Sequence, residues 1–150
     1  MANSIRENIL VKVEAALNTL TGVGTVERSR ITPISESLAF PAIFLFEDRE
    51  EVIINSPNTM GKVVKNLYLT LQVWQMDDGS GLSTQLNELL KNVETKIMSN
   101  SQWDSLAMQT IPGESRNFIN FNSTKGFGFL GFEFDFRIQY RHTFYDPETA

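Results

Sequence analysis

Two carboxylates near the C-terminus have a spacing that could support acid–base chemistry. Glu133 and Asp135 alternate with apolar residues, so they lie about 6.6 Å apart on one side of a predicted strand. Such a pair can act as general acid and base where a cleft raises the pKa of one member. Arg137 and Arg141 continue the same side, and alternating charge along a strand is more often a solvated or intersubunit surface. The pattern therefore favours Glu133, Asp135, Arg137 and Arg141 as intersubunit contacts, with a carboxylate-based hydrolase as the less favoured alternative.

The residue types used by most other catalytic sites are scarce. The chain has no cysteine and one histidine, which excludes thiol nucleophiles and cysteine-ligated metals and removes most histidine-based metal sites. Gly126–Gly131 spells G-x-G-x-x-G, but it opens a strand, whereas a dinucleotide fingerprint opens a helix. No spacing combines a nucleophile, a base and oxyanion donors. We therefore expect a binding or assembly protein with no catalytic residue, no cofactor and no metal.

Two further charged groups suggest contacts with partners. Arg28 and Arg30 lie two residues apart on one face of a short polar strand, where they could bind a carboxylate-rich partner. The densest acidic cluster is a predicted charged loop that contains Glu47, Asp48, Glu50 and Glu51. With 18 acidic and 13 basic residues the net charge is −5, which disfavours tight binding to phosphates. The acidic loop is then either a solvated surface or a surface that faces a polyanion without adhering to it.

The helices that position these residues follow from their apolar periodicity. Ser4 and Glu7 form a predicted capping box, after which apolar residues recur on one face as far as Leu20. A second helix is predicted from Leu82 to Ile97, with a narrow leucine-rich stripe. Each helix therefore has one face that must dock on a core.

Strands are predicted from alternating or continuously apolar runs. Residues 103–122 give weaker signals, which indicate one or two strands around a turn at Pro112-Gly113. The clearer strands are Thr25–Arg30, Ala42–Phe46, Lys62–Met76 and Phe129–His142.

Length and element order together predict the fold. A chain of 150 residues and 17.0 kDa has the size of one domain, here residues 1–150. The order of elements predicts an α+β fold, a mainly antiparallel twisted β-sheet with two amphipathic helices packed on one face. A strand from Phe129 to His142 would be about 46 Å long, but a compact globule of this size is only about 38 Å across. The strand must therefore bend or project, and we expect its edge to contact another subunit.

Targeting signals are not evident in the sequence. The N-terminal residues enter the first helical pattern without an apolar signal core, and the longest apolar run, Ala42–Phe46, is too short to span a bilayer. We therefore expect a protein made in the cytoplasm that does not enter a membrane.

Four segments carry a family resemblance that covers most of the chain. They are the opening amphipathic helix, the segment from Gly24 through Pro33 to Glu47, the strand-turn-helix from Leu67 to Ile97, and the final strand ending in Phe-Arg-Ile-Gln-Tyr-Arg. In this layout the sequence resembles the tail terminator proteins of tailed bacteriophages, the tail completion or minor tail protein U-like family.

The resemblance implies a structural virion protein. Such a subunit forms a hexameric ring at the head-proximal end of the tail tube, stops tube polymerisation, and provides a docking surface for head-completion (stopper) proteins of the neck. The implied partners are further copies of the chain, the tail tube protein, the head-completion protein, and the tail sheath protein if the tail is contractile. Assembly would take place in the host cytoplasm. Another neck or tail-tube component is the alternative within this class.

In such a ring, double-stranded DNA would pass through the lumen without specific binding. Glu47, Asp48, Glu50 and Glu51 would then face the lumen. The arginines and carboxylates singled out above would pair between subunits, because ring contacts join two different surfaces of the same chain.

Overall fold

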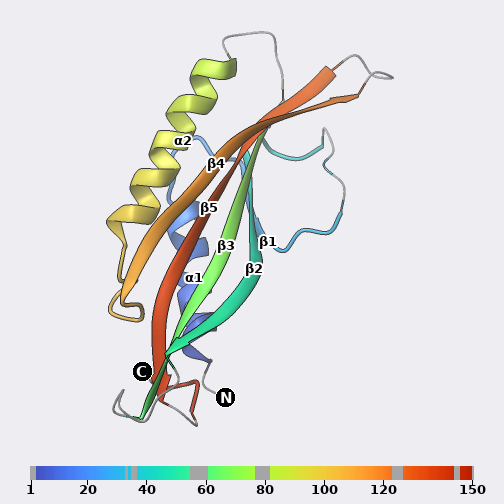
Figure 1. Cartoon of the computed structure of the whole chain (residues 1–150). Coiled ribbons are helices and arrows are strands. Elements are labelled where there is room, and N and C mark those ends of the chain that lie inside the picture. Colours follow the sequence, from blue (N-terminus) through green and yellow to red (C-terminus); the bar gives the residue numbers. More distant parts are fainter. Residues whose placement is uncertain are drawn as a thin grey trace.

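The computed structural model describes residues 3–32, 34, 37–54, 61–76, 82–122, 127–143 and 146–149. The fold is α+β, as predicted, with a five-stranded sheet and both helices on one side of it (Figure 1). The elements are α1 (Ile5–Asn18), β1 (Thr25–Arg28), β2 (Ala42–Ile54), β3 (Lys62–Met76), α2 (Leu82–Ser99), β4 (Gln109–Asn122) and β5 (Phe127–Thr143).

The strands are arranged in the order β1-β2-β3-β5-β4. The short strand β1 runs parallel to β2, and all other neighbouring pairs are antiparallel. The 17 residues of β5 would span about 56 Å if fully straight. Figure 1 shows β5 twisting and curving together with β3 and β4, as expected from its length. The prediction that its edge contacts another subunit is wrong, because β3 pairs with one edge of β5 and β4 pairs with the other as far as Gln139.

The core lies between the helices and one face of the sheet. Alternate residues of β3 and β5 point to this side, because successive side chains of a strand face opposite ways. They pack against the buried faces of α1 and α2. The core residues of the three central strands include Ile43, Leu45, Leu67, Leu69, Leu71, Val73, Phe132, Phe134, Phe136 and Ile138.

Helix α1 begins where the capping pattern predicts. Ser4 is extended, and its Oγ accepts a hydrogen bond from the backbone N–H of Glu7 at 3.2 Å. The carboxylate of Glu7 does not complete a reciprocal capping box but binds Arg28 instead. The backbone N–H of Ile5 donates to the carbonyl of Pro147, so the C-terminal segment also satisfies the helix start.

Strand β2 continues through Glu47–Glu51, which corrects the prediction of an acidic loop. Glu47 pairs with Leu69 and Arg49 with Tyr68, so Asp48 is the extra residue of a β-bulge. The bulge places both Glu47 and Glu50 on the helix side of the sheet, where a regular strand would have separated them. Four of these five charged residues have partners in the chain: Glu47 and Glu50 on the helix side, and Arg49 and Glu51 on the opposite side.

Strand β4 is continuous across Pro112-Gly113, where the sequence predicted a turn. Pro112 pairs with Phe136 and Ser115 with Phe134, so one extra residue forms a bulge at this point. Proline is tolerated here because β4 is an edge strand and no neighbour needs its missing N–H.

Strand β1 is shorter than predicted and ends at Arg28. Ser29 follows with a positive φ of 50°. The chain therefore turns before Arg30, and the two arginines do not share a strand face as predicted.

Candidate interaction surface

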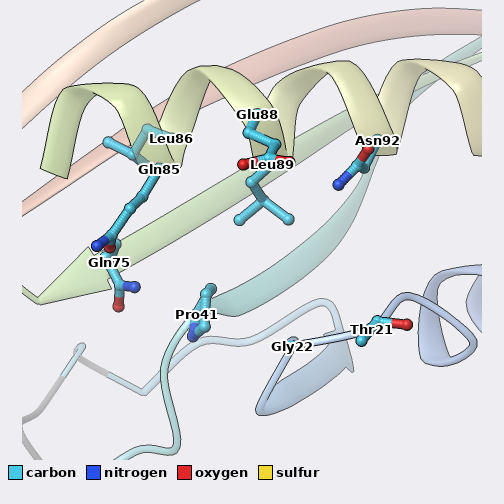
Figure 2. Close-up of a pocket in the computed structure, with 9 residues that line it drawn as sticks. All are labelled: Thr21, Gly22, Pro41, Gln75, Gln85, Leu86, Glu88, Leu89 and Asn92. Atoms are coloured by element: carbon cyan, nitrogen blue, oxygen red, sulfur yellow. The ribbon is translucent and has the colours of Figure 1, made fainter. Parts of the chain in front are cut away.

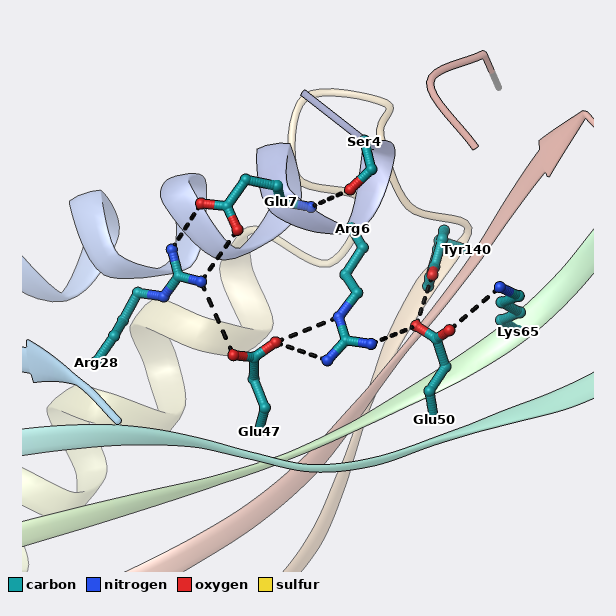
Figure 3. A network of polar contacts seen from close by, with 8 residues as sticks. All are labelled: Ser4, Arg6, Glu7, Arg28, Glu47, Glu50, Lys65 and Tyr140. Atoms are coloured by element: carbon teal, nitrogen blue, oxygen red, sulfur yellow. Dashed lines mark hydrogen bonds and ion pairs between the residues drawn. The ribbon is translucent and has the colours of Figure 1, made fainter. Parts of the chain in front are cut away.

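A polar network joins the start of α1 to the sheet (Figure 3). The guanidinium of Arg6 donates to Glu47 Oε1 from Nη2 at 2.7 Å and from Nε at 3.2 Å. Its Nη1 donates to Glu50 at 3.4 Å. Arg6 can reach both carboxylates because the bulge at Asp48 turns both toward the helix.

Glu50 is the most connected member of this network. Its carboxylate accepts a hydrogen bond from the hydroxyl of Tyr140 at 2.6 Å and pairs with the Lys65 ammonium at 3.2 Å. Tyr140 is only 2% exposed. Burial, and then the hydrogen bond to Glu50, raise the pKa of the Tyr140 hydroxyl well above its usual value.

Both arginines predicted to bind a partner have carboxylates of their own chain. Arg28 binds the two oxygens of Glu7 at 2.8 and 3.1 Å, and a Glu47 oxygen lies 3.9 Å from its Nη2. The hydrogen bond from Arg28 holds the pKa of Glu7 below its usual value. Arg30 donates to Glu27 at 2.8 Å, and its guanidinium lies 5.3 Å from the ring centroid of Phe44. These contacts give Arg28 and Arg30 roles within the subunit.

The four predicted acidic residues separate into two pairs. Glu47 and Glu50 belong to the network under α1. Asp48 and Glu51 are exposed, and Glu51 accepts a hydrogen bond from the Tyr68 hydroxyl at 3.0 Å. Asp48 and Glu51 are thus the exposed members of the four, and they lie in a strand instead of a loop.

The side of the sheet opposite the helices is the candidate interaction surface, called the open face below (Figure 1). Its side chains form rows across the strands, because the register aligns one residue from each strand. In the order β2, β3, β5, β4 the rows are Ala42-Trp74-Gly131-Phe118, Phe44-Gln72-Glu133-Arg116, Arg49-Tyr68-Arg137-Ile111 and Glu51-Asn66-Gln139-Gln109, with Phe46-Thr70-Asp135 between the second and third.

Glu133 and Asp135 lie on the open face as predicted, but both are paired within the chain. Arg116 of β4 binds Glu133 through Nη2 and Asp135 through Nη1, the second bond measuring 2.9 Å. Gln72 donates to Glu133 at 2.9 Å and Thr70 donates to Asp135 at 2.8 Å. This ladder satisfies both carboxylates on the sheet surface, an arrangement that favours a structural role over acid–base chemistry.

Arg137 and Arg141, the other two predicted contacts, differ from the paired carboxylates. Among the described residues neither makes an ion pair, and Arg141 is exposed. The Nε of Arg137 is shielded from solvent and has no hydrogen-bond partner within the described part of the chain. Arg137 therefore differs from Arg141 in that it combines the lack of an ion pair with a shielded nitrogen that has no hydrogen-bond partner among the described residues.

One end of the open face is aromatic. The ring centroids of Trp74 and Phe118 are 4.4 Å apart, and Phe129 lies 6.1 Å from Trp74 and 5.4 Å from Phe40. Phe118 reaches Trp74 by passing over Gly131, which has no side chain to obstruct it. The G-x-G-x-x-G pattern ends here in strand β5, consistent with its interpretation as part of a strand.

The helix side of the molecule also has a hollow of about 480 Å³ between α2 and the turn after α1 (Figure 2). Glu88 is the single ionisable residue among those that line it. Carboxamides and small residues make up most of the remaining lining, including Gln75, Gln85, Asn92, Thr21 and Gly22. The lining has no second charged group with which Glu88 could form a catalytic pair.

Two edges of the sheet are unpaired among the described strands. On one side of the sheet the outer edge is that of β1 and, beyond Leu45, that of β2, because β1 covers β2 only from Ala42 to Leu45. Val52 and Ile53, in this free part, are 50% and 43% exposed. At the opposite side of the sheet, the outer edge of β4 has no strand partner.

Three arginines important to these surfaces are not identified by the sequence patterns. Arg6 is distinguished in the sequence only as a residue off the apolar face of its helix, and Arg116 falls in the segment with weak strand signals. Arg49 is distinguished only as the cation within an acidic run. The alternation around Arg116 could have indicated its position opposite Glu133, but no local pattern reports contacts across 41 residues, such as Arg6 with Glu47.

Compared with models of known protein families and with curated protein sequences, the chain matches none significantly. Within the described chain, neither α1 nor α2 has the sustained apolar stretch that a bilayer span requires.

Proposed function

We propose that this protein is a structural virion component, a tail terminator subunit that forms a hexameric ring on the head-proximal end of a phage tail tube. The ring stops further tube polymerisation and presents a docking surface to head-completion proteins. The sequence layout supports the assignment to this class. The structural observation that carries it is the pair of unlike unpaired edges on opposite sides of one sheet.

The edges matter because a closed ring requires two different complementary surfaces on every subunit. An unpaired strand edge offers a row of backbone donors and acceptors to another chain. The free part of β2 is bulged and carries exposed β-branched side chains, whereas β4 is long and polar in its middle section. Contact between the β2 edge of one subunit and the β4 edge of the next would propagate around a ring.

Capping follows from the two unlike sides of such a ring. One side matches the last ring of the tube, and the other differs from a tube subunit and cannot accept another. The mechanism is geometric, so it requires no bond to be made or broken.

DNA passage needs a lumen that does not bind phosphates tightly. Glu47 and Glu50 cannot provide that lining, because they neutralise Arg6 and Lys65 inside the subunit. Asp48 and Glu51 remain exposed, but Arg49 lies between them in the strand. We therefore do not assign the open face to the lumen.

The test is electron microscopy of the purified protein mixed with isolated tail tubes. We expect ring-shaped density at the head-proximal end only, and tubes capped in this way should not elongate when tube protein is added. Repeated stacking along the tube would identify a tube-like protein, and binding to heads but not to tube ends would identify a stopper. Either result would contradict the terminator assignment.

A further inference from the structure

We propose that the open face carries a binding site for a carboxylate side chain of an acidic segment in a partner protein, formed by Arg49, Tyr68 and Arg137. The inference concerns one face of a single subunit and does not rest on the proposed function.

The three residues lie side by side in one row of the sheet. Arg49 of β2 pairs with Tyr68 of β3, and Tyr68 pairs with Arg137 of β5. With strands about 4.8 Å apart, the two arginine Cα atoms are roughly 10 Å apart. The Arg49 guanidinium carbon lies 4.1 Å from the Tyr68 ring centroid, so this side chain leans over the tyrosine toward β5. Arg137 is the neighbour of Tyr68 on the other side in the same row, so the two arginines flank the tyrosine.

The row lines a hollow of about 520 Å³ on the open face. The bulge in β4 bounds the hollow beyond Arg137, with Ile111, Pro112 and Gly113 among its lining residues. Such a hollow can receive a side chain inserted from a partner, with the guanidinium groups at one side and the bulge at the other.

The lack of an ion-pair partner distinguishes Arg49 and Arg137 from four other arginines in the chain. Arg6, Arg28, Arg30 and Arg116 each bind a carboxylate of this subunit. Arg49 and Arg137 have no ion pair among the described residues, and the shielded Nε of Arg137 lacks an acceptor there. Arg49 is exposed and Arg137 is half-buried, so a ligand carboxylate can approach the two arginines and supply the charge partner that the described chain does not.

The guanidinium groups and the acidic residues of the hollow together favour a carboxylate as the ligand. A guanidinium group presents parallel N–H donors that match the two oxygens of a carboxylate. Asp48 and Glu114 also line the hollow and would repel a highly charged phosphate or a nucleic-acid backbone. Asp135 lines it too, but Arg116 and Thr70 already hold that carboxylate. The lining thus holds Arg49 and Arg137 beside several carboxylates, so the single charge of a carboxylate side chain meets less repulsion there than a multiply charged anion would.

The test is an NMR titration of the whole chain with the peptide acetyl-Gly-Glu-Gly-amide, monitoring arginine Nε–H signals. We expect a saturable shift of the Arg137 signal. Arg49→Gln and Arg137→Gln should each weaken binding at least about fivefold, observed on backbone signals of β3 and β5. Arg141→Gln is the matched control, since Arg141 is an exposed arginine on the same strand, and it should leave the affinity unchanged.

The same peptide with Gln in place of Glu, and inorganic phosphate, complete the experiment. The Gln peptide should produce no saturable shift, and phosphate should bind more weakly than the Glu peptide. No shift with the Glu peptide, equal shifts with both peptides, or tighter binding of phosphate would each overturn the proposal. None of these results would alter the decoration of tail tubes, so failure here is distinguishable from failure of the ring assignment.

Discussion

Tyr140 and Tyr68 make the same kind of hydrogen bond in different surroundings. The Tyr140 hydroxyl donates to Glu50 at 2.6 Å from a position that is 2% exposed, whereas Tyr68 donates to the exposed Glu51 at 3.0 Å. When a buried donor is removed, water cannot easily take its place, so the carboxylate loses a hydrogen bond without compensation. In addition, a hydrogen bond to a charged group contributes more to stability than a hydrogen bond between two neutral groups.

We expect Tyr140→Phe to lower the free energy of unfolding by about 2 kcal/mol, because the buried bond to Glu50 is lost. Tyr68→Phe is the matched control and should cost less than about 0.5 kcal/mol, because water replaces the lost partner. Urea unfolding monitored by circular dichroism measures both. Equal costs for the two variants would show that burial does not strengthen the Tyr140 contact.

The raised pKa of the Tyr140 hydroxyl also predicts how the free energy of unfolding responds to alkaline pH. Its pKa is raised in the folded protein by burial and by Glu50, whereas an unfolded tyrosine titrates near pH 10. A raised pKa means that the folded state retains the proton longer, so the contribution of Tyr140 is fully present below about pH 10 and is lost as the pH rises further.

The measurement compares the unfolding free energies of the wild type and Tyr140→Phe at pH 9 and pH 11. Their difference should shrink by about 1.4 kcal/mol between these values, since one pH unit above the unfolded pKa corresponds to that energy. The comparison cancels the titration of lysines, which both proteins share. A constant difference would contradict the raised pKa.

The candidate site was predicted only in part at the residue scale. Glu133, Asp135, Arg137 and Arg141 lie on one strand face as the alternation indicates, because side-chain direction in a strand is a local property. Their partners could not be predicted in the same way. Whether a carboxylate is free or paired depends on Arg116, which reaches it across a strand pairing that no single segment specifies.

At the scale of elements, β5 is the strand on which the sheet depends, since it pairs with β3 along one side and β4 along the other. Gly131 is the fifth residue of this strand and lies between Trp74 of β3 and Phe118 of β4. A Cβ at this position would overlap the Val73 carbonyl oxygen and would come within 2.7 Å of Cζ of Phe118. The absence of a side chain at residue 131 therefore allows both the strand spacing and the aromatic contact.

Gly131→Ala should lower the unfolding free energy by about 3 kcal/mol, because the overlap involves the backbone of a central strand. Gly22→Ala is the matched control. Gly22 has a positive φ of 82°, but a Cβ there would meet no atom within 4 Å, so only the backbone strain of about 1 kcal/mol applies. Thermal or urea unfolding separates the two. A cost for Gly131→Ala no greater than that of the control would show that the strands shift apart freely.

The elements that were predicted correctly share a regular period. α1, α2, β3 and β5 each begin and end within a few residues of the expected positions, because one apolar face repeats without interruption. β2 and β4 were predicted to break where the structure has bulges, at Asp48 and beyond Pro112. A bulge changes the face of every later side chain, so it resembles a loop in the sequence although the backbone ladder continues.

At the scale of the whole molecule, the sheet has both helices on one face and strand edges without strand partners on two sides within the described chain. These edges lie on opposite sides of the subunit, so one contact between them leaves a second of the same kind available. Repetition of that contact generates either a closed ring or an open filament, depending on the rotation between neighbours. One experiment can therefore test whether the β2 edge of one subunit contacts the β4 edge of the next.

The absence of cysteine makes this test direct. Val52, in the free part of β2, and Ser115, in β4, are exposed and lie near the two unpaired edges. In the double variant Val52→Cys/Ser115→Cys, a short thiol-reactive crosslinker should join the β2 edge of one subunit to the β4 edge of the next. We expect a ladder of covalent species that ends at the hexamer on denaturing gels.

Each single variant is the matched control and should give no ladder, because its cysteines would lie on the same edge of every subunit. A double variant that remains monomeric on the gel, under conditions in which rings are visible by electron microscopy, would show that the ring uses surfaces other than these two edges.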